Sequence, residues 1–115
     1  MNDWKKTIPV AITVCDKNGT IIEMNDKSRA TFLKPGDPDL IGHDLMACHP
    51  PHAQQKIRHL LATGTTNTYT IEKNGIHKLI HQAPWFQNGE VAGLVELSIE
   101  IPAEMPHYIR TPNKK

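Results

Sequence analysis

The sequence of 115 residues has few cysteines, few aromatic side chains and no long hydrophobic run. No apolar stretch approaches the roughly 20 residues that a membrane-spanning helix needs. The two cysteines, Cys15 and Cys48, lie far apart in the sequence, which excludes a disulfide framework and a zinc site built on CxxC pairs. We therefore expect both thiols to be reduced.

An excess of charge of one sign is also lacking. Lys and Arg together number 13 and Asp and Glu 12, for a formal net charge of +1, so no global field attracts nucleic acid or an anionic membrane. The N-terminus leads into a strand-like segment without the small-residue cleavage site of a signal peptide. We expect a cytoplasmic protein with no nucleic-acid partner and no membrane partner.

What the sequence does have is the composition of an ordinary globular protein, with 38% hydrophobic and 22% charged residues. Its length allows one domain. We expect this domain at residues 8–101, after an N-terminal extension at residues 1–7. Residues 102–115 should form an irregular C-terminal tail, because Pro102, Pro106 and Pro112 interrupt regular structure.

Short β-branched segments separated by Asn-Gly pairs predict β-hairpins. The pairs are Asn18–Gly19, Asn74–Gly75 and Asn88–Gly89, and Asn-Gly readily takes the positive φ angles of a tight turn. The strands that we expect beside these turns are residues 8–15, 20–24, 67–73, 76–86 and 91–101.

The segment between the second and third strands predicts short helices. Asn25 or Asp26 can cap a brief helix that runs to Phe32, because these side chains accept hydrogen bonds from the first free backbone amides. Residues 40–49 indicate a loop and a single helical turn.

A longer helix is expected from residues 50–51 to about Thr63. Proline suits a helix start and Gly64 suits its end. At 100° per residue His52 and His59 fall on the side opposite to an apolar stripe. The stripe consists of Ala53, Ile57, Leu60 and Leu61.

This order of elements predicts an α+β domain with one five-stranded antiparallel sheet and short helices on one face. The first hairpin should join the later three strands, because it cannot bury its apolar face alone. Alternation along the last strand predicts which side chains face the core. They are Val91, Gly93, Val95, Leu97 and Ile99, whereas Ala92, Leu94, Glu96, Ser98 and Glu100 should be largely in water.

The pattern resembles a PAS domain over residues 8–101. Residues 12–25 (ITVCDKNGTIIEMN) are similar to the family's opening strand, acidic turn, second strand and Asn, and residues 40–46 (LIGHDLM) to its IG-L segment. Residues 93–101 are similar to its last strand. Residues 48–51 (CHPP) most resemble bacterial PAS modules that accompany hemerythrin-like domains, although no hemerythrin-like segment is present.

The resemblance implies a sensory module rather than an enzyme. A cavity between the sheet and the helices would bind a small molecule or cofactor, and the sheet would pass the change to a signalling output protein, which acts in trans or has been lost by truncation. The identity of the ligand stays open. A ligand-free protein-interaction module is the alternative, because fold alone does not fix function.

The expected cavity lies between the long helix and the sheet. A strand histidine or His49 would provide polar contact, and if haem is bound, His49 is the candidate axial ligand and Cys48 the next. His49 can instead brace the turn before the helix, and Cys48 can be a small buried hydrophobe. The apolar lining is expected to be Ile57, Leu60, Leu61, Val95 and Leu97.

Other chemistry has weaker support. His77 and His81 share one strand face and would need a third ligand to hold a metal, and no HExxH spacing is present. Adjacent residues such as Cys48 and His49 do not form a catalytic pair by sequence, and no phosphate loop is present, so we expect no enzyme.

A homodimer is expected, because a sheet with helices on one face leaves the other face uncovered. The tails could instead fold back within the monomer. The apolar material available for the uncovered face is Trp4, Ile8, Leu94, Met105, Tyr108 and Ile109.

Overall fold

The structure of the protein is a computed structural model that describes residues 3–112, except for the side chain of Cys48. The predicted α+β class is confirmed, and the first helix has no counterpart among the predicted elements. The elements are α1 (Trp4–Thr7), β1 (Ala11–Asp16), β2 (Ile21–Met24), α2 (Asp26–Phe32), the 3-10 turn η1 (Leu45–Cys48), α3 (Pro51–Thr63), β3 (Asn67–Lys73), β4 (Ile76–Gln87) and β5 (Glu90–Ile101).

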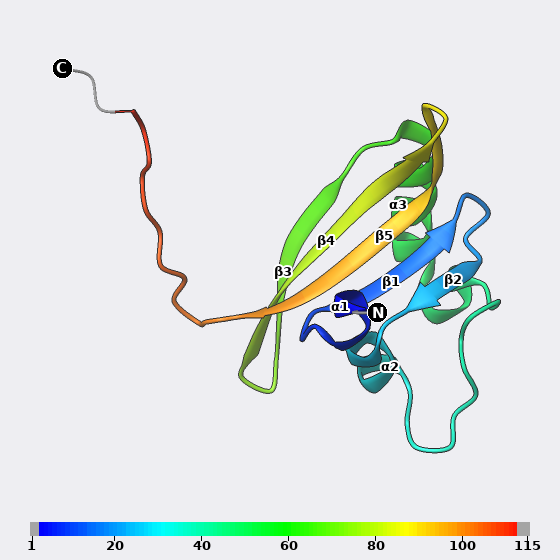
Figure 1. Ribbon diagram of the computed structural model, residues 1–115, viewed down its shortest axis with the longest axis horizontal. Coiled ribbons are helices and arrows are strands. Elements are labelled where there is room, and N and C mark those ends of the chain that lie inside the picture. The colour runs from blue at the N-terminus through cyan, green and yellow to red at the C-terminus, as the bar shows by residue number, and fades with distance from the viewer. Residues whose placement is uncertain (1–2, 113–115) are drawn as a thin grey trace.

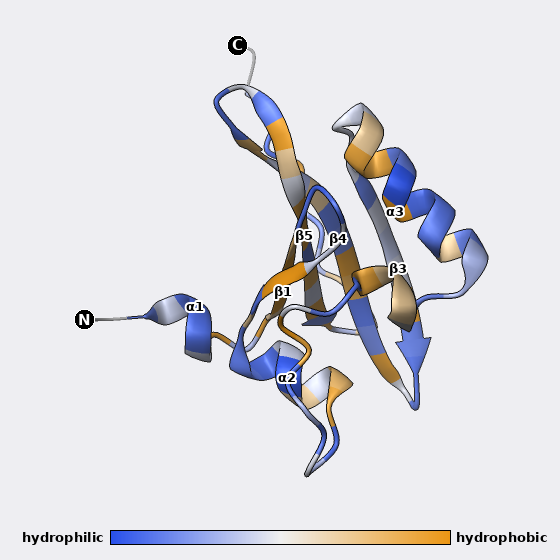
Figure 2. Cartoon of the chain, turned by 90° about the vertical axis from the view of Figure 1, so that its right-hand side faces the viewer, coloured by the Kyte–Doolittle hydropathy of each residue, from blue (hydrophilic) through white to orange (hydrophobic). Residues whose placement is uncertain are grey.

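The five strands form one antiparallel sheet in the order β2-β1-β5-β4-β3. The first hairpin therefore joins the later strands through the pairing of β1 with β5, as expected (Figure 1). We call the face on which α2 and α3 pack the inner face, and the opposite face the outer face. Figure 2 shows α3 on one side of the sheet and α1 on the other.

The two later hairpins turn as predicted. Asn74 and Gly75 have φ angles of 54° and 79°, and Asn88 and Gly89 have 54° and 80°, so both residues of each pair take the left-handed conformation of a tight turn. The first hairpin differs, because Gly19 alone of its Asn-Gly pair has a positive φ, 85°.

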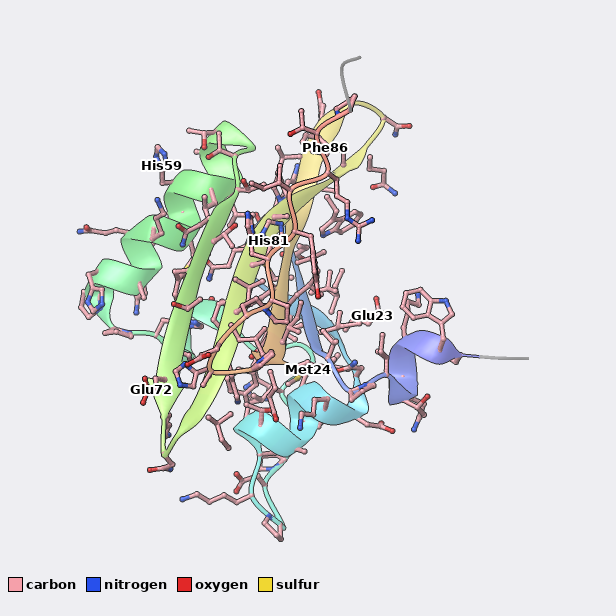
Figure 3. All side chains as sticks on the ribbon, turned by 90° about the vertical axis from the view of Figure 1, so that its left-hand side faces the viewer. Glu23, Met24, His59, Glu72, His81 and Phe86 are labelled. Atoms are coloured by element: carbon pink, nitrogen blue, oxygen red, sulfur yellow. The ribbon has the colours of Figure 1, made fainter. Side chains whose placement is uncertain are left out.

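The helices begin and end where local chemistry predicts. Asn25 caps α2, its side chain accepting a hydrogen bond from the Ser28 amide at 3.0 Å. Gly64 ends α3 with a φ of 67°, and its amide donates to the Leu60 carbonyl at 2.8 Å. His59 points away from the sheet (Figure 3), and His52 is exposed as expected.

The core lies between α3 and the inner face. Its buried members are Cys15, Met46, Ile57, Leu60 and Leu94, against which Leu45 and Leu61 pack. Burying a side chain of this size stabilises the fold by about 1.5–3 kcal/mol. The predicted apolar stripe of α3 is thus the side of the helix that faces the sheet.

The predicted orientation of β5 is wrong. Leu94 is 2% exposed and packs against Ile57 and Leu60, so alternation places its neighbour Val95, and with it Leu97, on the outer face. The reason is a bulge, since β5 pairs Val91 with Phe86 but Gly93 with Trp85. Ala92 is the extra residue. It reverses the alternation of side chains between the two faces that the sequence predicted from Val91 onward.

The tail after β5 has no helix or strand over residues 102–112 and runs away from the sheet (Figure 1). Its apolar side chains are exposed, Tyr108 at 70% and Ile109 at 81%. The alternative in which the tail folds back within the monomer is therefore not the observed arrangement. Among residues 3–112, no helix is both long and apolar enough to cross a membrane.

Candidate functional site

A row of polar side chains crosses the inner face, which we call the inner polar row. Its strand members are directly paired neighbours, Asn67 opposite Gln82, Gln82 opposite Glu96, and Glu96 opposite Thr13. Ser28 of α2 extends the row, because its Oγ lies 2.6 Å from Thr13 Oγ1. The row therefore runs from β3 at one edge of the sheet to the helix that covers β1.

Hydrogen bonds orient the first half of this row. Asn67 Nδ2 donates to Gln82 Oε1 at 2.9 Å, and Gln82 Nε2 donates to Glu96 Oε2 at 2.8 Å. Gln82 is only 4% exposed, and its amide is held by a donor on one side and an acceptor on the other. The Glu96 carboxylate is the acceptor at which this chain of donors ends.

A small chamber lies beside the row, between the sheet and the segment from α2 to η1. Its volume is about 20 Å³, which is room for about one water-sized group. Three polar residues line it, Thr13, Glu96 and His49. The remaining lining is apolar and consists of Ile21, Met24, Phe32, Leu40 and Leu45.

His49 follows η1 and is half-buried. Its Nδ1 lies 2.8 Å from the Leu45 carbonyl oxygen, and since a carbonyl only accepts, Nδ1 donates in this bond. In the neutral ring Nε2 then carries a lone pair and is free to accept. Nδ1 thus braces the turn before the helix, whereas Nε2 is the ring nitrogen that is left for the predicted polar contact.

An open groove of about 260 Å³ adjoins the chamber, with His49 lining both. It runs between α3 and β3, and Lys56 and His52 bring basic groups to its helix side. Burial and the nearby negative charge of Glu96 raise the pKa of Tyr69, which lines the groove from β3. The inner face therefore presents a carboxylate inside and basic groups at the rim.

The structure brings only some of the predicted lining residues together. Ile57 and Leu60 are fully buried in the core and Leu61 is partly buried against it. Val95 and Leu97 lie on the outer face and do not line the chamber, because of the bulge in β5. The side chain of Cys48 lies outside the described part of the structure, and its backbone ends η1.

The residues around His49 do not fit haem. The Nε2 atom of His49 has the free lone pair that an axial ligand needs, with the other ring nitrogen held by a carbonyl. The chamber volume of about 20 Å³ is, however, more than tenfold below the roughly 300 Å³ of small cofactor pockets. The adjoining groove is larger, but it is open and its lining residues are mostly polar, unlike the apolar walls of a cofactor pocket. We therefore propose no haem site on the inner face.

The strand histidines do not form a metal site either. His77 and His81 are four residues apart along β4, a separation of about 13 Å. His81 Nδ1 bonds Thr68 Oγ1 at 2.8 Å on the outer face (Figure 3), and His77 Nε2 lies 3.6 Å from Glu72 Oε1. Within the described range, no three His, Cys, Asp or Glu side chains gather closely enough to hold a metal.

Sequence reasoning missed Asn67, Gln82 and Glu96. Gln82 and Glu96 are polar residues within largely apolar strands, and this was the available signal. Asn67 begins a mostly polar strand, so the sequence offered no such signal for it. The strand alternation predicted Glu96 to be largely in water, so its position beside the chamber required the correct register of β5.

Comparison with known proteins agrees with this architecture. A family model described as the PAS fold matches residues 6–104. A comparison with curated proteins found no match. The family match extends over nearly the whole chain, and it carries no information on an association with hemerythrin-like domains.

Solved structures are similar in fold at low sequence identity. A PAS domain from Colwellia psychrerythraea has a TM-score of 0.62 at 22% identity and covers 85% of this chain and 91% of its own. The PAS domain of histidine kinase ThkA has 0.63 at 18%, covering 78% and 97%. The VqmA dimer of Vibrio cholerae has 0.68 at 16%, covering 87% of this chain but 51% of VqmA. With the family match and the five-stranded sheet in agreement, the chain belongs to the PAS family.

Proposed function

We propose that this PAS domain is a sensory module that binds a small molecule on the inner face and passes the change to a signalling partner. The observation that carries the proposal is the contact between the inner polar row and an apolar chamber. Thr13 lines this chamber and Gln82 lines the adjoining groove. Both are buried polar residues, and hydrogen bonds within the row offset the cost of burying them. A few aimed polar groups in an apolar wall are typical of ligand sites.

Ligand entry requires the chamber to widen. Its outer wall includes Phe32, Leu40 and Leu45, which belong to or border residues 33–44, a segment without helix or strand. Such a segment moves more readily than the sheet. We propose that a ligand displaces this wall and contacts His49, with Cys48 as a further candidate at the same turn.

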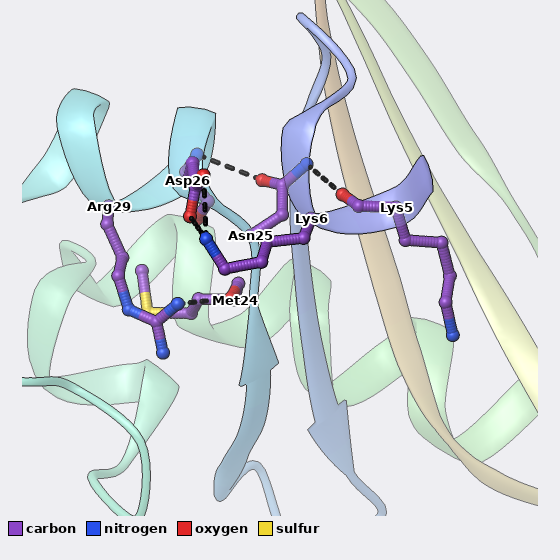
Figure 4. Close-up of polar contacts among 7 residues, drawn as sticks. Lys5, Lys6, Met24, Asn25, Asp26 and Arg29 are labelled. Carbon is purple, nitrogen blue, oxygen red and sulfur yellow. Dashed lines mark hydrogen bonds and ion pairs between the residues drawn. The ribbon is translucent and has the colours of Figure 1, made fainter. Parts of the chain in front are cut away.

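A route from the chamber to the N-terminus passes through Asn25. Thr13 of the row contacts Ser28, whose amide donates to Asn25 Oδ1 at 3.0 Å. Asn25 Oδ1 also accepts from the Ile12 amide, and Asn25 Nδ2 donates to the Lys5 carbonyl at 2.9 Å (Figure 4). One side chain thus links β1, α2 and α1.

We propose that this link transmits movement of α2 to α1. The Lys6 ammonium group adds an ion pair to Asp26 at 3.1 Å, so α1 is fastened to α2 by two kinds of contact. In an Asn25→Ala variant we expect amide exchange in α1 to become insensitive to ligand. Retained coupling in that variant, with the ligand still bound, would contradict the proposed route.

The outer face is the proposed surface for a second copy. It carries partly exposed apolar side chains that neither α2 nor α3 covers, and the VqmA dimer shows that a structurally similar protein assembles in pairs. The output protein would then act in trans or belong to a longer chain. The residues of this surface are Ile12, Val14, Leu79, Val95, Leu97 and Ile99.

Domain limits at residues 1–7, 8–101 and 102–115 stay a prediction. The ties from α1 to Asn25 and Asp26 suggest that the N-terminal residues contribute to the stability of the domain. We propose that a chain starting at residue 8 unfolds at a lower temperature than the full chain. An equal unfolding temperature would show that α1 is a separate extension.

Native mass spectrometry of freshly purified protein tests the sensory proposal. We expect a copurifying small molecule, and nuclear magnetic resonance should show that adding it back shifts the methyl signals of Met24 and Leu45. As a control, the methyl signals of Val14 on the outer face should stay in place. If no metabolite of a broad library changes the unfolding temperature, the ligand-free interaction module is the correct function.

Light scattering tests the homodimer. We expect about twice the 12.9 kDa chain mass, reduced to a monomer by Leu97→Glu on the outer face. The matched control is Ile71→Glu, which changes an exposed apolar residue on the inner face of β3. A wild-type mass of one chain across micromolar concentrations would overturn the dimer.

A further inference from the structure

We propose that the ligand of the inner face is a small primary amine in its protonated form, with its ammonium group held in the chamber and a short apolar body beside it. This inference rests on the sensory function proposed above and specifies the chemical class of the ligand. Its basis is the charge and hydrogen-bonding capacity of the three polar residues that line the chamber.

The charge at the chamber favours a cationic ligand. Glu96 lines the chamber, and it belongs to none of the five ion pairs found among residues 3–112. Its Oε2 accepts a hydrogen bond from the neutral amide of Gln82. A carboxylate at an apolar wall attracts a cation more strongly than it would in water, so a cationic ligand supplies the charge that the protein lacks there.

The hydrogen-bonding groups of the chamber residues favour a ligand that donates. The three polar residues that line the chamber each carry an acceptor, namely the Glu96 carboxylate, the Thr13 hydroxyl and the His49 Nε2 atom. The His49 role follows from the contact of Nδ1 with the Leu45 carbonyl. An ammonium group has three N–H donors and no acceptor, so its donors match these three acceptors in number and kind.

The volume and the apolar lining of the chamber favour a small head group with a short apolar body. The volume of about 20 Å³ holds one water-sized group, which is also the size of an ammonium head. All other lining residues are apolar, and an aliphatic body can pack against Phe32, Leu40 and Leu45 once that wall moves outward. An anionic head would meet the Glu96 carboxylate and is excluded by repulsion.

Three molecules of one shape test the class on the full chain: isopentylamine, isopentyl alcohol and isovalerate. We expect isopentylamine to shift the methyl signals of Met24 and Leu45. The alcohol should bind at least about tenfold more weakly, as expected when a charge-assisted bond becomes a neutral one, and isovalerate should not bind.

Two charge-neutralising variants complete the test. Glu96→Gln should weaken isopentylamine binding at least about tenfold. Glu90→Gln, which makes the same change at an exposed position on the same strand, should leave binding unchanged. Should Glu96→Gln fail to fold, the comparison of the three molecules on the wild-type chain still decides the class.

The outcomes separate this inference from the sensory function itself. If the alcohol or isovalerate shifts the same methyl signals at equal or lower concentration, the amine class is wrong and the inner-face site stands. If isopentylamine does nothing while a copurified metabolite without a primary amine shifts these signals, the class is again wrong and the site stands. If no small molecule shifts them, both proposals fall.

Discussion

The inner and outer faces of the sheet are built from alternate residues of the same strands, yet they have different environments. On the inner face Leu94 is 2% exposed and Gln82 is 4% exposed. Their chain neighbours Val95 and His81, on the outer face, are only partly buried. The covering helices, rather than the strands, therefore decide how much each residue of the sheet contributes to stability.

Polar groups follow the same division. Inner-face side chains bond one another in a continuous row, from Asn67 through Gln82 to Glu96. On the outer face the polar contacts are isolated pairs open to water, such as His81 with Thr68. Four experiments test how differently the two faces contribute to the stability of the domain.

Truncating one leucine in the core at the inner face and one leucine on the outer face should give the largest difference in the free energy of unfolding. Leu60→Ala removes a fully buried side chain and should lower the free energy of unfolding by about 2–5 kcal/mol. Leu97→Ala on the outer face should cost less than about 1.5 kcal/mol in the monomer, because less area is lost from burial. Urea denaturation at a concentration where light scattering reports monomer checks both, and equal losses would refute the comparison.

Removing one polar partner on each face should give the next contrast. Gln82→Leu takes away the donor to Glu96 and the acceptor of Asn67, and should cost about 1–3 kcal/mol. His81→Ala should change stability by no more than about 0.5 kcal/mol, because its site is open to water. A Gln82→Leu variant as stable as the wild type would show that the hydrogen bonds of the inner polar row do not contribute to the free energy of unfolding.

Gly93 lies where β5, the backbone of β1 and the Trp85 side chain pack closely together on the outer face, and a substitution there tests this packing. A Cβ at this position would meet the Cys15 carbonyl oxygen and lie 2.5 Å from Trp85 Nε1, which itself donates to that carbonyl at 3.0 Å. Gly93→Ala should therefore cost about 1–3 kcal/mol by overpacking. Thermal unfolding is the readout, and an unchanged midpoint would mean that β1 and β5 can separate locally without loss.

The smallest effect should be a dependence of stability on pH from Cys15. Burial raises the pKa of this thiol above its usual 9.0, so the folded chain keeps its proton while the unfolded chain loses it. The free energy of unfolding should then fall as pH rises above about 9. The fall should be smaller in Cys15→Ala, and identical profiles in urea denaturation at pH 8–10 would contradict the thiol's role.

Local rules predicted much of the fold. The Asn74–Gly75 and Asn88–Gly89 turns and the Asn25 and Gly64 caps depend on a few neighbouring residues, so a short stretch of sequence contains their cause. The side of α3 that faces the sheet was predicted for the same reason, since Ile57 and Leu60 share one side of a regular helix.

The candidate site was less accessible to this reasoning. His49 was predicted because its place before a helix could be read along the chain. Gln82 and Glu96 were not, because their contact joins separate strands and depends on a register that the bulge at Ala92 shifts. With apolar residues at both odd and even positions of β5, no local rule chose between its two faces.

The turns, the helix ends, the stripe of α3 and the family pattern could be predicted from the amino-acid sequence, because they follow from interactions within one turn or one strand. The face of β5 that meets α3 could not, and with it the burial of Leu94 in the core and the position of Glu96 beside the chamber. A pleated strand offers two nearly equivalent faces. The packing of α3 and the pairing with β1 remove that equivalence, and both involve residues far away in the chain.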